Sequence, residues 1–339
     1  MILAGDIGGT NTRLALVAGG DDHLSLAEEA TFPSREYANL EAVLERFLSS
    51  RRLPVERACF GVAGPVRHGR IDATNLPWVV DSRSLARQLG LEAIGLINDL
   101  EANAYGIAVL EAKDFAVLNA GAADAEGNAA IISAGTGLGE AGLYWDGTHH
   151  RPFATEGGHT SFAPRTALEM DLLRHLLREF QHVSVERVLS GPGLFHIYRF
   201  LRDTGHGEEP AWLAEALRQR DPPAVIAETA LEGKHGLCIQ ALELFVSIYG
   251  AEAGNLALKV MARGGVFVGG GIAPKILPKL QEPMFLKAFS GKGRMTPLLL
   301  AMPVRVILND NTALLGAARY AAQSATLDRP PAGIPGAHR

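Results

Sequence analysis

The sequence has few cysteines and no long apolar run. Its only two cysteines, Cys59 and Cys238, both lie in apolar segments, which is typical of small buried side chains rather than of a disulfide framework or a zinc site. No uninterrupted run of about 18 apolar residues occurs, and Asp6 interrupts the first apolar stretch before it could form the core of a signal peptide. We therefore expect a cytoplasmic protein that is neither secreted nor inserted in a membrane.

Basic residues are not in excess either. The chain has 32 Lys and Arg against 37 Asp and Glu, a formal net charge of -5, so no basic field is expected to attract nucleic acid or an anionic membrane. The GxxxxGK[ST] phosphate loop is also absent. This argues against a P-loop fold and favours other small-molecule chemistry.

The length and the glycine content are informative. With 339 residues, 47% of them hydrophobic, the chain exceeds the size at which single cores stop growing, about 250 to 300 residues, so we expect two domains. Its 38 glycines are about 11% of the residues against a usual value of about 7%. They gather in short clusters, and these clusters are where we expect function.

Strand and helix signals alternate along most of the chain, which favours an α/β class. Strands are predicted at 2–4 and 13–17, then a helix over about 36–50, a strand in "RACFGVAG", a short helix ending at Gly90 and a strand in "AIGLIND". A similar run starts at Phe115 and contains "AAIISAG", the turn "GTGLGEAG" and "LYWDG". The similarity between this run and the N-terminal strand–turn–strand run indicates internal duplication.

Three glycine clusters are predicted to lie at strand ends, in "AGDIGGTNTRL", "SAGTGLGEAG" and "VGGGIAP". Gly8 and Gly9 can adopt positive φ and let backbone N–H groups converge on a phosphate, with Thr10 as a further donor, and Asp6 could hold a hydrated Mg²⁺ nearby. A single turn of this kind is also an ordinary hairpin. Three of them together favour phosphate binding.

Asn98 and Asp99 end a buried strand and precede a helix. Ligands of open α/β sheets bind outside the carboxyl ends of strands, which suits a substrate-binding carboxylate, although an Asp at such a junction is also a common helix N-cap. Glu156 and His159, in "TEGGHTSFAP", could bond to vicinal sugar hydroxyls. A metal site is the alternative, but it requires a third ligand close to these two residues. Glu186, in "VERVLSGPGL", could equally be a solvated surface charge.

The motifs "GDIGGTNTRLAL", "IND", "GTGLG", "EGGHTSFAP", "ERVLSGPGL", "VFVGGGIAP" and "NDNTALLGA" follow in this order from residue 2 to about residue 325. Together they resemble the bacterial glucokinase family that has no structural zinc. The resemblance implies an α/β, two-lobed actin-like ATPase (ribonuclease H-like) fold, with a duplicated mixed-sheet core and a nucleotide and sugar cleft between the lobes. The chain departs from the pattern in "TSF" after the EGGH motif, where relatives have an acidic residue, and in its proline-rich tail.

The same resemblance implies the roles of individual residues in ATP-dependent phosphorylation of glucose. Asp99 corresponds to the catalytic base, and Asp6 lies near the Mg²⁺, bound through water. Glucose would be bound by Asn98, Asp99, Glu156, His159 and Glu186. ATP would be bound by three sets: Gly5, Asp6, Ile7, Gly8, Gly9 and Thr10; Gly135, Thr136 and Gly137, in a loop that runs to Gly139; and Gly269, Gly270 and Gly271.

The expected organisation is a small α/β domain over 1–108, completed by a C-terminal helix at about 305–325, a large helix-rich domain over 109–304, and a disordered tail over 326–339. The resemblance also suggests a homodimer. A kinase for another hexose or an N-acetylhexosamine is the alternative enzyme, and a non-catalytic sugar-sensing protein is the alternative of another class. No helix-turn-helix segment precedes Gly9, so a sugar-sensing repressor is not expected.

Overall fold

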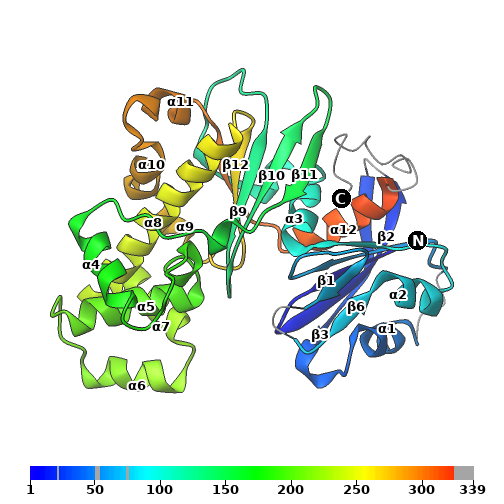
Figure 1. Cartoon of the computed structure of the whole chain (residues 1–339), viewed down its shortest axis with the longest axis horizontal. Coiled ribbons are helices and arrows are strands. Elements are labelled where there is room, and N and C mark those ends of the chain that lie inside the picture. Colours follow the sequence, from blue (N-terminus) through cyan, green and yellow to red (C-terminus); the bar gives the residue numbers. More distant parts are fainter. Residues whose placement is uncertain (21–22, 50–53, 74–75, 324–339) are drawn as a thin grey trace, which may run out of the picture. The chain divides into compact units, whose positions relative to one another are not determined.

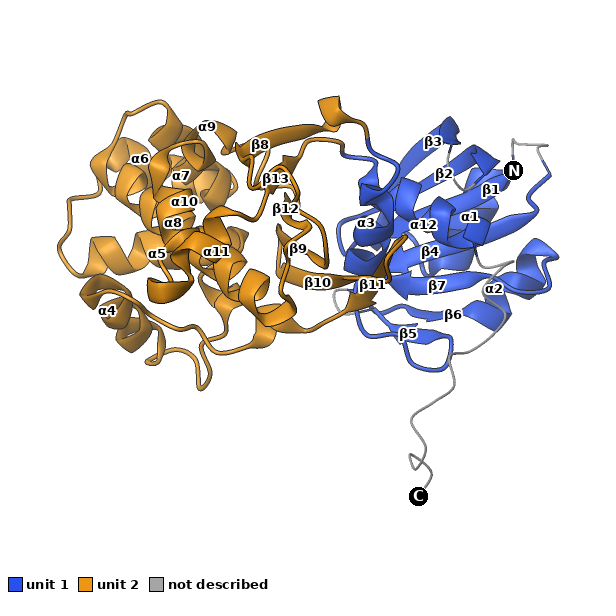
Figure 2. Ribbon diagram, turned by 90° about the horizontal axis from the view of Figure 1, so that it is seen from above, with its two compact units in different colours: residues 1–110, 310–339 blue, residues 111–309 orange. Residues whose placement is uncertain are grey.

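The computed structural model describes residues 1–20, 23–49, 54–73 and 76–323. They form two compact units: unit 1 contains residues 1–110 and the described residues from 310 on, and unit 2 contains residues 111–309 (Figure 2). The chain leaves unit 1 after Leu110 and returns to it after Asn309. The tail predicted over 326–339 lies outside the described residues.

Unit 1 is built on a mixed sheet in the order β3-β2-β1-β4-β7. Strand β1 is antiparallel to β2, and β2 to β3, whereas β1, β4 and β7 run parallel. The bounds are Ile2–Ile7 for β1, Asn11–Gly20 for β2 and His23–Pro33 for β3 (Figure 1), and Arg57–Val62 for β4 and Gly95–Asn98 for β7 (Figure 2). The short strands β5 (Arg70–Asp72) and β6 (Val79–Asp81) form a separate ladder.

Apolar side chains on both faces of this sheet pack against helices. Because successive strand residues point to opposite faces, Leu3 belongs to the core under α1 and α2, and Ala4 to the core under α3 and α12. The helices are α1 (Leu40–Leu48), α2 (Ser82–Leu89), α3 (Asp99–Ile107) and α12 (Thr312–Gln323).

Local sequence signals explain where these helices begin and end. Asn39 caps α1, which is therefore shorter than the predicted 36–50, and Leu40, Val43, Leu44 and Phe47 form its buried face. Asp81 accepts a hydrogen bond from the Ser84 amide at the start of α2, and Gly90 ends α2 with a left-handed φ of 67°. The C-terminal helix begins at Thr312, later than the predicted 305, because Val304–Ile307 forms strand β13.

Unit 2 repeats the five-strand order of unit 1 and adds a sixth strand, β8, antiparallel to β13. Its sheet is β11-β10-β9-β12-β13-β8, in which β9 is antiparallel to β10, β10 is antiparallel to β11, and β9 is parallel to β12 and β12 to β13. The predicted internal duplication is therefore confirmed. The bounds are Phe115–Asn119 for β8, Ala129–Ala134 for β9, Leu138–Trp145 for β10, His150–Ala154 for β11, Gly265–Gly269 for β12 and Val304–Ile307 for β13.

The rest of unit 2 is mainly helical, as predicted from residue 165 onward. Helix α8 (Gly236–Val260) is long and apolar enough to cross a membrane, but 72% of its most apolar window is buried inside the structure, so it is a core helix. The other helices are α4 (Ala167–Leu176), α5 (Gly191–Asp203), α6 (Ala211–Gln219), α7 (Pro222–Leu231), α9 (Leu277–Leu280), α10 (Pro283–Ser290) and α11 (Thr296–Leu300).

The two cysteines are free and buried, one in each unit, as predicted. Burial raises the pKa of the Cys59 thiol well above its ordinary value and that of Cys238 to about 12. Neither thiol is therefore a reactive nucleophile.

Helix α12 packs on α3 at a distance that requires glycine. A Cβ atom at Gly316 would collide with the carbonyl oxygen of Ala102, and one at Gly106 with the carbonyl oxygen of Thr312. Close approach of two backbones is a structural use of glycine, so this helix pair depends on Gly106 and Gly316.

Gly316→Ala is expected to lower the free energy of unfolding by about 1–3 kcal/mol, the usual effect of overpacking, because α12 must move away from α3. The measurement is urea unfolding followed by circular dichroism. Gly236→Ala is the control: it changes a glycine at the start of α8 where a Cβ meets only the end of the Gln240 side chain. Equal stability of the Gly316→Ala variant and the wild type would contradict the account.

Candidate active site

Three parallel strands of unit 1 end side by side. Ile7 of β1 is in register with Val62 of β4, and Val62 with Asn98 of β7. Asp6 precedes the end of β1, and Asp99 begins α3 directly after β7. Between them Gly61 of β4 lies close to α3, where a Cβ would be 3.6 Å from the Cα of Asp99. The predicted placement of both carboxylates at the carboxyl ends of strands is confirmed.

The two carboxylates interact electrostatically. Burial and the negative charge of Asp99 raise the pKa of Asp6 from 3.8 to about 6, while Arg13 lowers it. A buried carboxylate near a second carboxylate is an environment that a divalent cation would stabilise, since Mg²⁺ prefers carboxylate and water oxygens. The donor set therefore fits a hydrated Mg²⁺ bound by Asp6.

Arg13, which the sequence analysis did not single out, lies directly opposite Asp6 in the β1–β2 pair. Its Nη2 bonds to Glu29 Oε1 at 2.5 Å and also to Asn311 Oδ1, and its Nη1 bonds to the carbonyl oxygen of Asp310 at 2.5 Å. Arg13 thus joins the first hairpin to β3 and to the segment before α12. The sequence signal that could have identified Arg13 is its position two residues after the first glycine turn, which places it opposite Asp6 in a hairpin.

Asn98 is the N-cap of α3. Its Oδ1 accepts hydrogen bonds from the amides of Leu100 and Glu101, at 2.9 and 3.4 Å, and its Nδ2 donates to Gly64 O at 3.1 Å. The capping role considered for Asp99 therefore belongs to Asn98, because the helix begins one residue earlier than predicted. One oxygen of Asp99 accepts from the Leu100 amide at 2.9 Å.

The first glycine turn is a β-hairpin. Gly8 N donates to Asn11 O at 2.9 Å, and Ser34 supports the turn by donating its hydroxyl to Gly8 O and its amide to Thr10 O. The expectation of a positive φ is wrong for Gly8; the hairpin closes without it. Gly5 lies within β1 and serves packing, because a Cβ there would collide with the Phe60 ring.

The second glycine turn joins β9 to β10 in unit 2. Gly135 N donates to Gly137 O at 2.8 Å, as Gly8 does in its own turn, and Gly135 O accepts from Gly191 N. Thr136 is exposed at the tip, as Thr10 is in the first turn. The two Gly-Thr turns thus occupy equivalent positions in two equivalent sheets.

Glu186 is held against this second turn. Its Oε2 accepts from the Leu138 amide at 2.9 Å, and a Cβ at Gly137 would be 2.5 Å from the same oxygen. Glu186 is half-buried, so the solvated-charge alternative does not describe its surroundings.

Glu156 and His159 lie on the turn of 3-10 helix at Gly157–His159, which follows β11. Both side chains are exposed, and His159 Nε2 is 3.8 Å from Glu156 Oε2. A hydrogen bond of 2.9 Å from Val185 N to Thr160 O brings this turn close to the segment that carries Glu186. The described residues contain no cluster of three metal-ligating side chains.

The third glycine cluster follows β12. Gly270 has a φ of +81°, and a Cβ there would collide with the carbonyl oxygen of Ala134, so this position requires glycine. The buried Tyr249 hydroxyl accepts from Ala134 N at 3.2 Å and lies 3.2 Å from Gly269 O, to which it donates. Tyr249 thereby fixes the ends of β9 and β12 beside each other.

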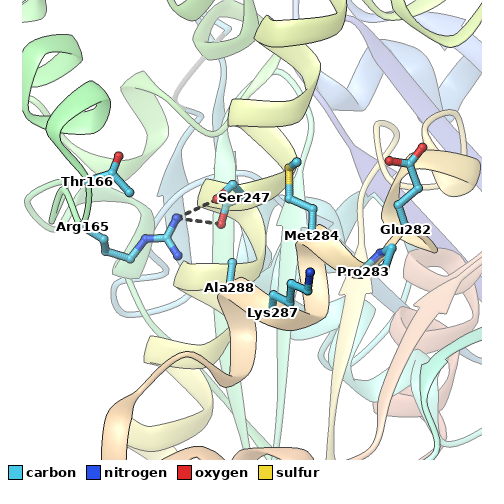
Figure 3. Close-up of a pocket in the computed structure, with 8 residues that line it drawn as sticks. All are labelled: Arg165, Thr166, Ser247, Glu282, Pro283, Met284, Lys287 and Ala288. Atoms are coloured by element: carbon cyan, nitrogen blue, oxygen red, sulfur yellow. Dashed lines mark hydrogen bonds between the residues drawn. The ribbon is translucent and has the colours of Figure 1, made fainter.

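The structure brings the predicted residues together as two sets, one in each unit. Unit 1 holds the first glycine turn with Asp6, Asn98 and Asp99, and unit 2 holds the other glycine clusters with Glu156, His159 and Glu186. A pocket of about 470 Å³ in unit 2, lined by Arg165, Ser247, Glu282 and Lys287 among others, contains none of these residues (Figure 3).

Two mixed sheets of the same strand order, each with a Gly-Thr turn in its first hairpin, define the class of actin-like ATPases and sugar kinases. The glucokinase family model matches residues 3–324. The chain is 44% identical to the glucokinase of Nostoc sp. (strain PCC 7120), with 95% of this chain and 99% of that one covered. The chain therefore belongs to the glucokinase family, whose enzymes phosphorylate glucose with ATP.

Solved structures agree with this assignment. The structure of a glucokinase from an Antarctic psychrotroph has a TM-score of 0.81 and 34% identity, with 94% of this chain and 98% of that one covered. A glucokinase of the ROK family from Streptomyces griseus, solved with glucose and AMPPNP, has a TM-score of 0.65 at 20% identity, with 95% and 99% covered. The second match supports the fold alone.

The raised pKa of Asp6 predicts a pH-dependent gain in stability for Asp6→Asn. Because folding favours the neutral form, the wild type loses stability as the pH rises from about 4 to about 6, and the isosteric amide does not. The variant should be more stable by about 1–3 kcal/mol at pH 7 and similar at pH 4, since one pKa unit is about 1.4 kcal/mol. Urea unfolding at pH 4, 5, 6 and 7 measures this difference.

Asp146→Asn is the matched control for that experiment. The His149 amide and then Arg151 lower the pKa of Asp146 to about 2, so this variant should be less stable than the wild type by an amount that is constant from pH 4 to pH 7. A constant difference for Asp6→Asn over the same range would contradict the electrostatic account of Asp6.

Proposed function

We propose that this chain transfers the γ-phosphoryl group of ATP to the 6-hydroxyl of D-glucose, with Asp99 as the general base. As a member of the glucokinase family the chain is an ATP-dependent kinase of glucose. The observation that carries the mechanistic part is the position of Asp99 at the end of β7, beside Asp6 and outside the parallel strands.

Asp99 would accept the proton of the 6-hydroxyl as its oxygen attacks the phosphoryl group. The Oδ1 atom of Asp99 accepts from the Leu100 amide at the N-terminus of α3, which fixes the carboxyl group with respect to the helix. The other carboxyl oxygen would then face the sugar hydroxyl. Positioning of this kind is the main contribution that a protein makes to phosphoryl transfer.

The two Gly-Thr turns would bind the phosphates of ATP. The amides of Gly8 and Gly135 close their own turns, so the proposed donors are the amides that follow, in Gly9 and Thr10 and in Thr136 and Gly137. Donors aimed at the phosphoryl oxygens stabilise the charge that develops on them. Gly269–Gly271 would line the adenosine.

Asp6 would hold Mg²⁺ through water. The metal, when bound, offsets negative charge on the phosphate oxygens. Asp6 itself would be ionised in that complex, because a bound cation lowers the pKa that burial and Asp99 raise.

Glu156, His159 and Glu186 would bind glucose hydroxyls, together with Asn98. Polar groups of this kind discriminate strongly between epimers, because the wrong epimer leaves a partner unpaired. A homodimeric state, which the family resemblance suggests, and a cytoplasmic location, which the two apolar-segment cysteines favour, complete the proposal.

Asp99→Asn is expected to lower kcat by about 10²- to 10⁴-fold or more, the range that a positioned base supplies, while glucose binding is largely retained. The measurements are the coupled assay of glucose 6-phosphate formation and glucose titration calorimetry. Asp72→Asn, which changes an exposed aspartate in β5, is the control and should keep wild-type turnover.

Near-normal turnover of the Asp99→Asn variant would contradict the assignment of the base. A raised KM for glucose with an unchanged kcat would contradict it in the same way, because Asp99 would then serve binding alone.

A further inference from the structure

Glu140 is an acidic residue in the interior of unit 2. It lies in β10, only 2% of it is exposed, and its Oε1 atom has no hydrogen-bond partner among the described residues. A buried carboxyl group without a full set of partners costs free energy. Neither the fold nor the proposed phosphoryl transfer requires an acid at this position.

Glu140 supports the turn that carries Glu156 and His159. Its Oε2 atom lies against Gly157, where even a Cβ atom would collide with it. Thr155 Oγ1 donates to the backbone carbonyl of Glu140 at 2.9 Å, and Gly157 N donates to Thr155 Oγ1 at 3.2 Å. The turn is thus bonded to the backbone of Glu140 through Thr155 and packs against the Glu140 side chain.

The charged groups that face Glu140 come from α8. Burial first, and then the charge of the buried Glu252, raise the pKa of Glu140 from 4.5 to about 7, and Lys259 opposes this. Lys259 Nζ is 3.5 Å from Glu252 Oε1, and Lys292 bonds to Asn255, which donates to Glu252. Tyr249, also on α8, is neutral because burial raises its pKa.

Within the described part of the chain, Glu252 and Lys259 are the charges that act on Glu140. On β9 its register partner is the apolar Ile132. On the supported turn it contacts Gly157, while Glu156 and His159 are exposed. The protonation of Glu140 therefore depends mainly on its burial, on Glu252 and on Lys259.

We propose that Glu140 is a positioning residue of the sugar site: its neutral carboxyl group holds the Gly157 turn in place, and its ionisation displaces that turn and weakens glucose binding. The inference rests on the proposed function, in which Glu156 and His159 bind the sugar. When Glu140 ionises, its charge is repelled by Glu252. The carboxylate becomes hydrated only if the turn that covers it moves away. Proton transfer at Asp99 is not affected.

The test is the dissociation constant of glucose, measured by calorimetry without ATP from pH 6.0 to pH 8.5. We expect it to rise by about 5-fold or more in the wild type, the lower end of typical coupling between two sites. In Glu140→Gln, which keeps the shape but cannot ionise, it should stay constant near the wild-type value at pH 6.0. The kcat at saturating glucose should be the same for both proteins at each pH.

Two further variants keep the inference falsifiable if Glu140→Gln folds poorly. Glu252→Gln removes the like charge and should move the midpoint of the wild-type profile to lower pH, whereas Lys259→Met removes the opposing charge and should move it to higher pH. A merely structural role of these residues would not produce opposite shifts.

A pH profile that persists unchanged in Glu140→Gln would overturn the inference, because His159 or another group would then be its cause. A wild-type profile that is flat from pH 6.0 to pH 8.5 would overturn it as well and leave the proposed function intact. Failure of the wild type to bind glucose at any pH would overturn the proposed function, and the inference with it.

Discussion

The burial of Asp6 beside a second carboxylate, Asp99, is the constraint that the residues at this end of the unit 1 sheet must accommodate. Parallel pairing of β1, β4 and β7 brings the two carboxylates to one edge of the sheet, and burial there raises the pKa of Asp6. Arg13, opposite Asp6 in the β1–β2 pair, limits this cost because its charge lowers the pKa of Asp6. Gly61 permits the close approach of α3 to β4, and Asn98 caps α3 there. Such a pair of acids is costly in the free protein and useful when a cation and a phosphate are bound.

Unit 2 repeats the sheet but uses it differently. Its Gly-Thr turn is equivalent to that of unit 1, yet the groups around it come from outside the sheet: Glu186 binds the turn, and Tyr249 of α8 fixes the ends of β9 and β12. Glu140 adds an acid between β10 and α8, under the turn that carries Glu156 and His159. The repeated sheet thus provides the equivalent Gly-Thr turns, and residues outside it, such as Glu186 and Tyr249, make the contacts particular to unit 2.

Much of this fold could be predicted, because apolar periodicity and caps are local signals. The helix that contains α1, the end of α2 at Gly90 and the strand before Asn98 were all predicted from such signals. Strand β3 was missed because it is an edge strand with no fully buried face. Gly8 does not use the positive φ that glycine allows, because the hairpin closes without it. Arg13 and Glu140 were missed because their importance comes from partners distant in sequence, Asn311 and Glu252.

The central claim is that these residues form a kinase selective for glucose. The most direct measurement is kcat/KM with ATP for glucose, mannose, fructose, N-acetylglucosamine and N-acetylmannosamine. The account predicts that glucose exceeds each of the others by at least about 10²-fold, because polar partners in the sugar site are left unpaired by the wrong sugar. Equal or greater kcat/KM for an N-acetylated hexosamine or another hexose, or no ADP release that depends on glucose, would contradict it.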